Sequence, residues 1–222
     1  MSSNKPESLK GKNAIVTGGS RGIGKGIANE LASRGANILI TYQSAKAQAE
    51  EVVSELELEH GVTAIAIAAD GHDLSAPQTI VQAAVDKWGQ IDIIVKNAGA
   101  REDYDFEDMT HETFKRQITA ICRVAIRAMD MQVVLPIQPV KVELKVPGPV
   151  NTELWARSIK NPEVLKAWEP TIQNTSAAPR VGEVDDIAQA VAFLCEEGSR
   201  WVTGSVISVS GGLYFNQTIT AT

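Results

Sequence analysis

A glycine-rich loop is the segment of this sequence with the clearest chemical meaning. It reads TGGSRGIG at residues 17–24, between a short apolar run and a stretch with helical spacing. Gly18, Gly22 and Gly24 form the pattern G-x-x-x-G-x-G within it. A pyrophosphate can approach the backbone N–H groups of a helix N-terminus only where no side chain blocks the way. The loop therefore predicts a dinucleotide-binding site.

The end of the next apolar run indicates which dinucleotide is bound. An NAD site uses an acidic residue about 20 residues after the loop to hold the ribose 2′-hydroxyl. Here the run NILITY (37–42) has no acid at its end, and the first carboxylate beyond it is Glu50. Arg21, Ser44 and Lys46 supply donors suited to a 2′-phosphate, which favours NADP. The alternative is that Arg21 and Lys46 are only solvated.

Alternating strand and helix patterns surround the loop and must position it. Short apolar runs predict buried strands, and apolar residues at intervals of three and four predict the helices between them. Strands are expected at 14–19, 37–42, 63–70 and 91–99, and helices at 22–35, 44–61 and 76–89. The alternation predicts an α/β fold, a Rossmann-like doubly wound parallel sheet with helices on both faces, in a single domain.

The second half of the chain has a different pattern. Helical spacing at 110–131 is followed by a strand at 140–146, in which apolar and charged residues alternate. Helices at 161–170 and 184–199 and a last strand at 204–212 complete the chain. We divide the domain into a cofactor half (9–127), an atypical junction (128–146), and a substrate lid with the C-terminal half (147–222).

Composition excludes several classes of protein. The chain has 222 residues, 44% hydrophobic and 22% charged, with a net charge of -6, which argues against nucleic acid as a partner. Two cysteines and three histidines without ligand spacing predict neither a disulfide scaffold nor a metal site. The polar start and the lack of a membrane-length apolar run predict a soluble cytoplasmic protein, with no membrane partner.

Five motifs, in order, resemble the short-chain dehydrogenase/reductase family. The glycine loop is similar to the family's cofactor loop, and Asp70 ends the third strand as the family's adenine-contacting aspartate does. KNAG (96–99), PGPVNTEL (147–154) and the segment 180–212 resemble the remaining motifs, with Lys96 in place of an asparagine. The resemblance covers residues 9–127 and 146–214.

The resemblance implies an NADP-dependent oxidoreductase and a set of cofactor contacts. The phosphates would be cradled by Gly18, Ser20, Arg21, Gly22, Ile23 and Gly24, and the adenosine ribose flanked by Tyr42 and Ser44. Asp70 would contact the adenine, and Asn97 and Gly99 would lie beside the other ribose. Val150 and Thr152 would hold the carboxamide. The plainer alternatives are glycines in turns, Asp70 capping a helix, and Thr152 as a helix N-cap.

The family's catalytic residues have no counterpart. The resemblance calls for a tyrosine that exchanges a proton with the substrate oxygen, a lysine one helical turn later, a serine and an asparagine. They belong in the 50 residues from Asn97 to Val146, which hold one crossover of about 30 or more residues where the family has two. The only tyrosine there, Tyr104, precedes Asp108 by four residues, and Ile121 stands at the asparagine position. No serine occurs from residue 76 to residue 157, so we predict no catalytic residue.

A tyrosine and a lysine do have the family's spacing elsewhere, at Tyr42 and Lys46. Tyr42 ends the second strand, on the adenosine side of the cofactor, whereas hydride moves at the nicotinamide. A catalytic tyrosine must reach the substrate oxygen within hydrogen-bond distance. We therefore interpret this pair as a coincidence.

The missing block leads to further expectations. We expect the strand at 140–146 to pair directly beside 91–95. We also expect weakened self-association, because family members commonly dimerise through two helices of which one is absent. The segment 153–180 is expected to be a lid over a small-molecule substrate. Its two tryptophans, Trp155 and Trp168, could face an apolar or ring-shaped substrate, but packing against the protein is favoured.

Three functions stay open. The first is an NADP(H)-dependent oxidoreductase acting on an alcohol or carbonyl of a small metabolite, catalytically impaired in this form. The second is a non-catalytic NADP-binding pseudoenzyme or partner subunit. The third is a truncated chain that folds poorly.

Overall fold

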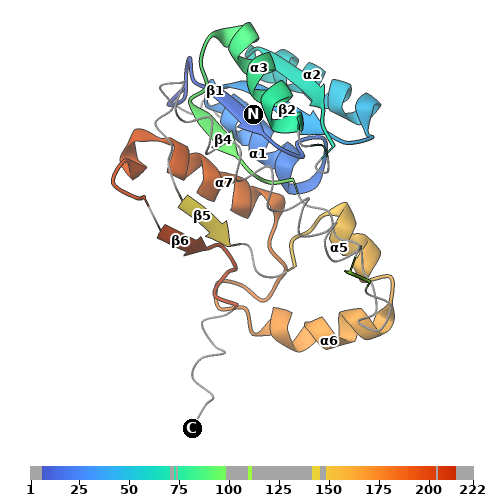
Figure 1. Ribbon diagram of the computed structural model, residues 1–222. Helices are drawn as coiled ribbons and strands as arrows, with labels where there is room; N and C mark the ends of the chain where they lie inside the picture. Colours follow the sequence, from blue (N-terminus) through green and yellow to red (C-terminus); the bar gives the residue numbers. More distant parts are fainter. Residues whose placement is uncertain are drawn as a thin grey trace. The chain divides into compact units, whose positions relative to one another are not determined.

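The computed structural model describes residues 7–70, 73, 75–98, 110–111, 142–145, 149–203 and 205–213. They group into two compact units, Met1–Pro139 and Val140–Thr222 (Figure 1). Unit 1 contains the glycine loop, and unit 2 contains the segment predicted to be the lid.

Unit 1 is built on a four-stranded parallel sheet. The strand order is β3-β2-β1-β4, so the chain moves outward from β1 to β3 and then returns to the other side of β1. Ligands bind beyond the carboxyl ends of the strands, at the point where the order reverses. The glycine loop follows β1 at that point. The strands are β1 (Asn13–Val16), β2 (Asn37–Tyr42), β3 (Ala64–Ala68) and β4 (Ile93–Val95).

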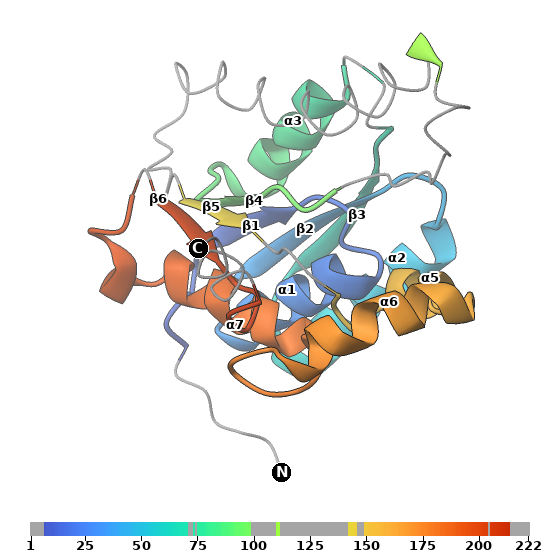
Figure 2. The ribbon, with the colours of Figure 1, turned by 90° about the horizontal axis from the view of Figure 1, so that it is seen from below.

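Helices cover both faces of this sheet. Figure 2 shows α3 (Ala76–Trp88) on one face, and α1 (Gly22–Ser33) and α2 (Lys46–His60) on the other. Ile80, Val81 and Ala84 of α3 form a buried cluster with Ile15 and Leu39 of the sheet. The other helices bury Ile27, Leu31, Val52 and Leu56. The prediction of a Rossmann-like doubly wound parallel sheet is confirmed.

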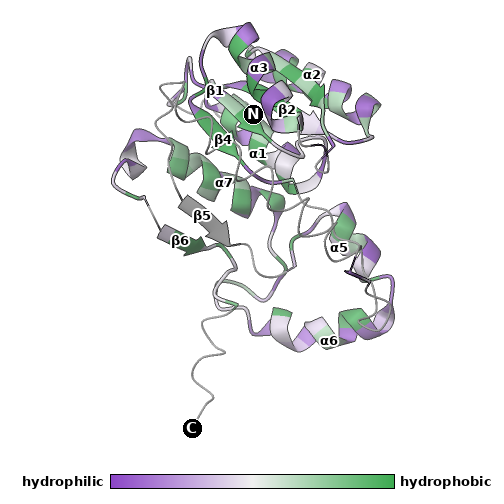
Figure 3. Cartoon of the chain, in the orientation of Figure 1, coloured by the Kyte–Doolittle hydropathy of each residue, from purple (hydrophilic) through white to green (hydrophobic). Residues whose placement is uncertain are grey.

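The local sequence explains these elements. β1 is fully buried, and it and β2 are mainly hydrophobic, as a strand covered on both faces requires (Figure 3). α2 and α3 both end at glycines with left-handed backbones, Gly61 (φ 67°) and Gly89 (φ 78°). Glycine adopts this conformation without a steric penalty, so the predicted helix ends are found within two residues.

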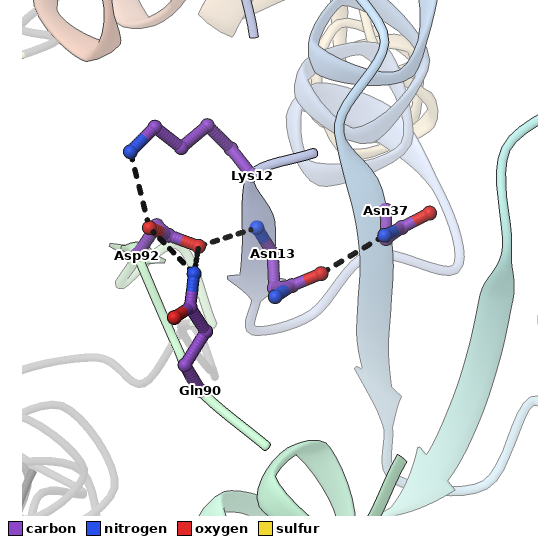
Figure 4. A network of polar contacts seen from close by, with 5 residues as sticks. All are labelled: Lys12, Asn13, Asn37, Gln90 and Asp92. Carbon is purple, nitrogen blue, oxygen red and sulfur yellow. Dashed lines mark hydrogen bonds and ion pairs between the residues drawn. The ribbon is translucent and has the colours of Figure 1, made fainter. Parts of the chain in front are cut away.

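A polar network fixes the amino ends of three strands in unit 1 (Figure 4). The side-chain amide of Asn37 donates to Oδ1 of Asn13 over 2.9 Å. Asp92 accepts from the backbone N–H of Asn13 over 2.9 Å and from Nζ of Lys12 over 3.2 Å. Gln90 also donates to Asp92. This network lies at the end of the strands opposite to the glycine loop, so we assign it to stability.

Unit 2 contains a parallel strand pair and the helices that join them. β5 (Val142–Lys145) pairs with β6 (Ser205–Ser208), with Val142 opposite Ser205. Along α7 (Val184–Cys195) the residues are mainly hydrophobic (Figure 3), and Ile187, Val191 and Leu194 are buried. The intervening elements are α5 (Glu153–Ser158), α6 (Pro162–Gln173), α7 (Val184–Cys195) and the short 3-10 helix η3 (Glu197–Ser199).

The strand predicted at 140–146 exists as β5, and its hydrogen-bonded partner among the described residues is β6. The predicted pairing of this strand beside 91–95 stays a prediction. Alternation identifies a strand and its faces but does not identify its neighbour. The crossover through α5, α6 and α7 is long enough to return the chain parallel to β5.

The helix predicted at 161–170 is longer than expected. α6 does not end at Pro170 but continues to Gln173. Lys166 and Pro170 are both exposed, so water can satisfy the carbonyl that the proline leaves without a partner. The helix predicted at 110–131 lies outside the described residues except for 110–111.

Candidate cofactor site

Three glycines of the loop are required by its geometry. Gly18 and Gly22 have φ angles of 67° and 53°, in the left-handed region that favours glycine. Gly24 has another reason, because a Cβ there would lie 2.2 Å from the carbonyl oxygen of Gly18 and 2.5 Å from Nδ2 of Asn97. The turn therefore leaves no room for a side chain at its centre. The interpretation as ordinary turn glycines does not account for the close approach at Gly24.

Two buried threonines anchor the loop to the neighbouring strands. The hydroxyl of Thr17 accepts hydrogen bonds from the backbone N–H groups of Asn97 and Ala98, both at 3.0 Å. The hydroxyl of Thr41 accepts from the backbone N–H of Gly18 at 3.0 Å. Thr17 is 3% exposed and Thr41 is 4% exposed, so water does not compete for these bonds. The loop is thus held from β1, β2 and the segment after β4.

Asn97 completes this support. Its side-chain amide donates to the carbonyl oxygens of Thr17 (3.0 Å) and Gly18 (3.2 Å). Its amide therefore lies against the loop, beside Gly24. The sequence assigned Asn97 to the cofactor ribose, and the structure adds a bracing role. Gly99, assigned to the same ribose, lies outside the described residues.

The first turn of α1 presents backbone donors next to the loop. Arg21 precedes the helix in an extended conformation (φ -161°, ψ 172°), and no side chain caps the helix there. The first N–H groups of a helix have no partner within the helix and attract anions. Ser20, Gly22 and Ile23 are half-buried, whereas the side chain of Arg21 is exposed. A phosphate group fits this set of donors.

The end of β2 carries the residues predicted to meet the adenosine part. Tyr42 is half-buried and pairs with Ala68 of β3, while Ser44 is exposed. Lys46 begins α2 and lies 3.6 Å from a carboxylate oxygen of Glu50. No hydrogen bond joins the Tyr42 hydroxyl to Lys46 in the part of unit 1 that the structure describes. The interpretation of the Tyr42 and Lys46 spacing as a coincidence stays a prediction.

Asp70 lies after β3 and contacts the end of β2. Its Oδ1 accepts a hydrogen bond from the side-chain amide of Gln43 over 3.3 Å. In the turn before α3, Asp73 accepts from the backbone N–H and the hydroxyl of Ser75, which lowers the pKa of the Asp73 carboxyl. This contact orders the turn before α3, whose N-cap residue Ser75 makes no side-chain capping hydrogen bond.

Val150 and Thr152 belong to unit 2. Val150 is 8% exposed and forms a bridge with Gly182. Thr152 is the N-cap of α5, because its hydroxyl accepts from the backbone N–H of Trp155 over 3.3 Å. The N-cap interpretation is therefore correct for Thr152. A contact of either residue with the carboxamide stays a prediction.

A small cavity of about 140 Å³ lies within unit 2. Asp186, at one wall, accepts two hydrogen bonds from the guanidinium of Arg180, the shorter at 2.7 Å. These bonds, together with one from the backbone N–H of Glu183, hold the pKa of Asp186 below its ordinary value. The cavity is smaller than the usual ligand pocket of about 300 Å³ or more. Its walls include Val150, Ala177, Gly182, Gly211 and Leu213.

The two tryptophans of the predicted lid contact each other. The ring centroids of Trp155 and Trp168 lie 6.0 Å apart, and the two ring planes make an angle of 89°, which is an edge-to-face arrangement. Each indole thus packs against the other, and the preference for packing over substrate contact stays a prediction. Their contact joins α5 to α6.

Other kinds of site are not found in the described ranges. No cluster of three or more potential ligands that could hold a metal ion occurs among these residues. None of the described helices is long and apolar enough to cross a membrane.

Comparison with known proteins identifies the family. A family model for short chain dehydrogenases matches residues 12–132, and one for enoyl-(acyl carrier protein) reductases matches residues 134–214. A short-chain dehydrogenase/reductase, FrzI, from Cladobotryum sp is 40% identical, with 95% of this chain and 98% of the relative covered. The chain belongs to the short-chain dehydrogenase/reductase family.

Solved structures agree with this assignment. A short chain dehydrogenase from Burkholderia cenocepacia in complex with NADP has a TM-score of 0.76 and 26% identity, covering 93% of this chain and 99% of that one. A blue fluorescent protein from a metagenomic library, in complex with NADPH, has a TM-score of 0.77 and 29% identity, with the same coverage.

The alignment with FrzI also bears on the missing block. It runs over 255 residues, whereas this whole chain has 222. Stretches of that relative therefore have no counterpart in this chain.

Proposed function

We propose that this protein is an NADP(H)-binding short-chain dehydrogenase/reductase whose ancestral reaction is oxidoreduction of an alcohol or carbonyl group of a small metabolite. The observation that carries this proposal is the braced glycine loop. Thr17, Thr41 and Asn97 hold its backbone in place, and the space at Gly24 is too small for a side chain. A loop that is ordered before binding loses less conformational freedom when the pyrophosphate arrives.

The preference for the 2′-phosphate rests on the end of β2. No carboxylate stands at the end of β2 itself, where an NAD site would use one for the ribose 2′-hydroxyl. Arg21 and Ser44 are exposed, and Lys46 begins a helix whose first turn has no acid and no side-chain cap. Such a helix start favours an anion. NADP(H) supplies the hydride or accepts it, and this chain's residues would bind its phosphates.

We further propose that this form is catalytically impaired. The sequence between Asn97 and Val146 contains no tyrosine with a lysine four residues later, and it contains no serine. The 255 aligned residues of FrzI against 222 in this chain support the loss of a strand-helix block. A non-catalytic NADP-binding protein, acting alone or with an intact relative, is the second candidate. The cytoplasm stays the predicted compartment.

A titration of the purified 222-residue chain with NADPH and NADH, followed by coenzyme fluorescence, tests the binding. We expect NADPH to bind and NADH to bind more weakly. Lack of binding by both would overturn the proposal for this form.

A turnover assay with carbonyl substrates separates the two candidates. Binding without turnover favours the non-catalytic protein, and turnover favours the enzyme. If turnover occurs and the Tyr42→Phe variant loses it, the dismissal of Tyr42 and Lys46 as a catalytic pair is wrong.

A further inference from the structure

We infer that Glu50 weakens the binding of the 2′-phosphate by holding the ammonium group of Lys46, and so tunes the preference between NADP(H) and NAD(H). The inference rests on the proposed function, because it concerns the group that distinguishes the two coenzymes. It assigns a role to a carboxylate that belongs to none of the family's motifs in this sequence.

The two side chains are neighbours on one face of α2. Lys46 is the first residue of the helix, and Glu50 lies one turn later, with Nζ and Oε1 3.6 Å apart. Residues four apart on a helix face each other, so this contact follows from the spacing. Both side chains are exposed, by 71% and 62%. A bound phosphate and Glu50 would therefore compete for one cation that both can reach from water.

The other charges of the site do not share this conflict. The guanidinium of Arg21 is exposed and forms no ion pair within the described part of unit 1. Glu55 also belongs to α2, but it contacts Lys25 of α1 at 2.7 Å. Asp70 accepts a hydrogen bond from the side-chain amide of Gln43. Glu50 is thus the carboxylate that occupies a cation proposed for the 2′-phosphate.

The size of the effect follows from the exposure of the pair. Exposed ion pairs shift an equilibrium by up to about fivefold, because water and salt screen them. Removing the Glu50 charge should therefore tighten NADPH binding by about two- to fivefold at low ionic strength. NADH lacks the 2′-phosphate, so its affinity should change much less.

A charge-matched pair of variants tests this inference. Glu50→Gln removes the contact with Lys46, whereas Glu51→Gln removes the same charge from the next residue, which is exposed and has no ion pair among the described residues. Dissociation constants for NADPH and NADH are measured for both variants and the wild type in low salt. We expect tighter NADPH binding in Glu50→Gln alone, with the gain reduced in high salt.

A third arm shows whether Lys46 carries the effect. In a Lys46→Gln background, Glu50→Gln should no longer tighten NADPH binding, because the cation it held is gone. The inference is overturned if Glu50→Gln and Glu51→Gln behave alike, if NADH gains equally, or if the gain survives without Lys46. If the wild type binds neither coenzyme, the proposed function fails and this inference fails with it. If the wild type binds NADPH and Glu50→Gln brings no gain, only the inference fails.

Discussion

Replacing Thr41 with valine tests whether the glycine loop is held by the contacts seen in the structure. The substitution keeps a β-branched side chain on β2 and removes the hydroxyl that accepts from the Gly18 N–H at 3.0 Å. Thr41 is 4% exposed and Gly18 is half-buried, so water has only partial access to the abandoned Gly18 N–H group. The change therefore isolates one hydrogen bond and leaves the packing of the strand almost intact.

The expected effect is a loss of about 1–2 kcal/mol in the free energy of unfolding. A buried donor without a partner costs about 1–3 kcal/mol. We expect the lower part of that range because valine favours a strand slightly more than threonine does. The loop also becomes less ordered, so NADPH binding should weaken by up to about tenfold, which corresponds to about 1.4 kcal/mol.

Urea unfolding and NADPH titration check both effects. The matched control is Thr41→Ser, which keeps the hydroxyl while losing a methyl group, and should bind NADPH nearly as the wild type does. An unfolding midpoint of Thr41→Val equal to that of the wild type, with unchanged NADPH affinity, would refute the reasoning that this bond orders the loop.

Three further predictions follow from single contacts. Gly24→Ala should abolish NADPH binding, because its Cβ would lie 2.2 Å from the Gly18 carbonyl oxygen, whereas Gly198→Ala, whose Cβ would meet nothing within 4 Å, should bind normally in the same titration. Asp92→Ala should lower the free energy of unfolding by about 1–3 kcal/mol, because the buried Asn13 N–H loses its acceptor; an unchanged urea midpoint would contradict this. Asp186 has a pKa below its ordinary value of 3.8, so its stabilising contribution is complete above that pH and is lost as the pH falls further. The temperature of thermal unfolding should therefore fall less steeply between pH 6 and about pH 2 for Asp186→Asn than for the wild type.

The fold of unit 1 was predictable because each of its strands is a short apolar run with a turn signal at its end. The glycine loop was predictable as well, because its chemistry depends on the absence of side chains, which a sequence shows directly. The anchoring role of Thr17 and Thr41 was missed. The available signal was a threonine at the end of an otherwise apolar buried strand, where a hydroxyl needs a buried partner.

Long-range pairing was the part that the sequence could not supply. The residues of β5 indicate a strand, yet its partner β6 lies about 60 positions further along the chain, beyond three helices. The prediction that the helix ends at Pro170 was wrong for a local reason. Exposure to water removes most of the penalty for the Lys166 carbonyl, which the proline leaves without a partner. The contact of Lys46 with Glu50 follows from helical spacing, but its relation to the coenzyme became apparent only when β2 and α2 were placed.

The edge-to-face pair of Trp155 and Trp168 gives unit 2 an optical signature of its own. Two indole rings held 6.0 Å apart and nearly perpendicular form a rigid, chiral chromophore pair in the near-ultraviolet. Trp201 is 94% exposed and Trp88 belongs to unit 1, and neither forms a ring pair of this kind among the described residues. Circular dichroism in this band will therefore follow the α5–α6 hairpin in particular, and a titration recorded there would register any rearrangement of that hairpin without an added label.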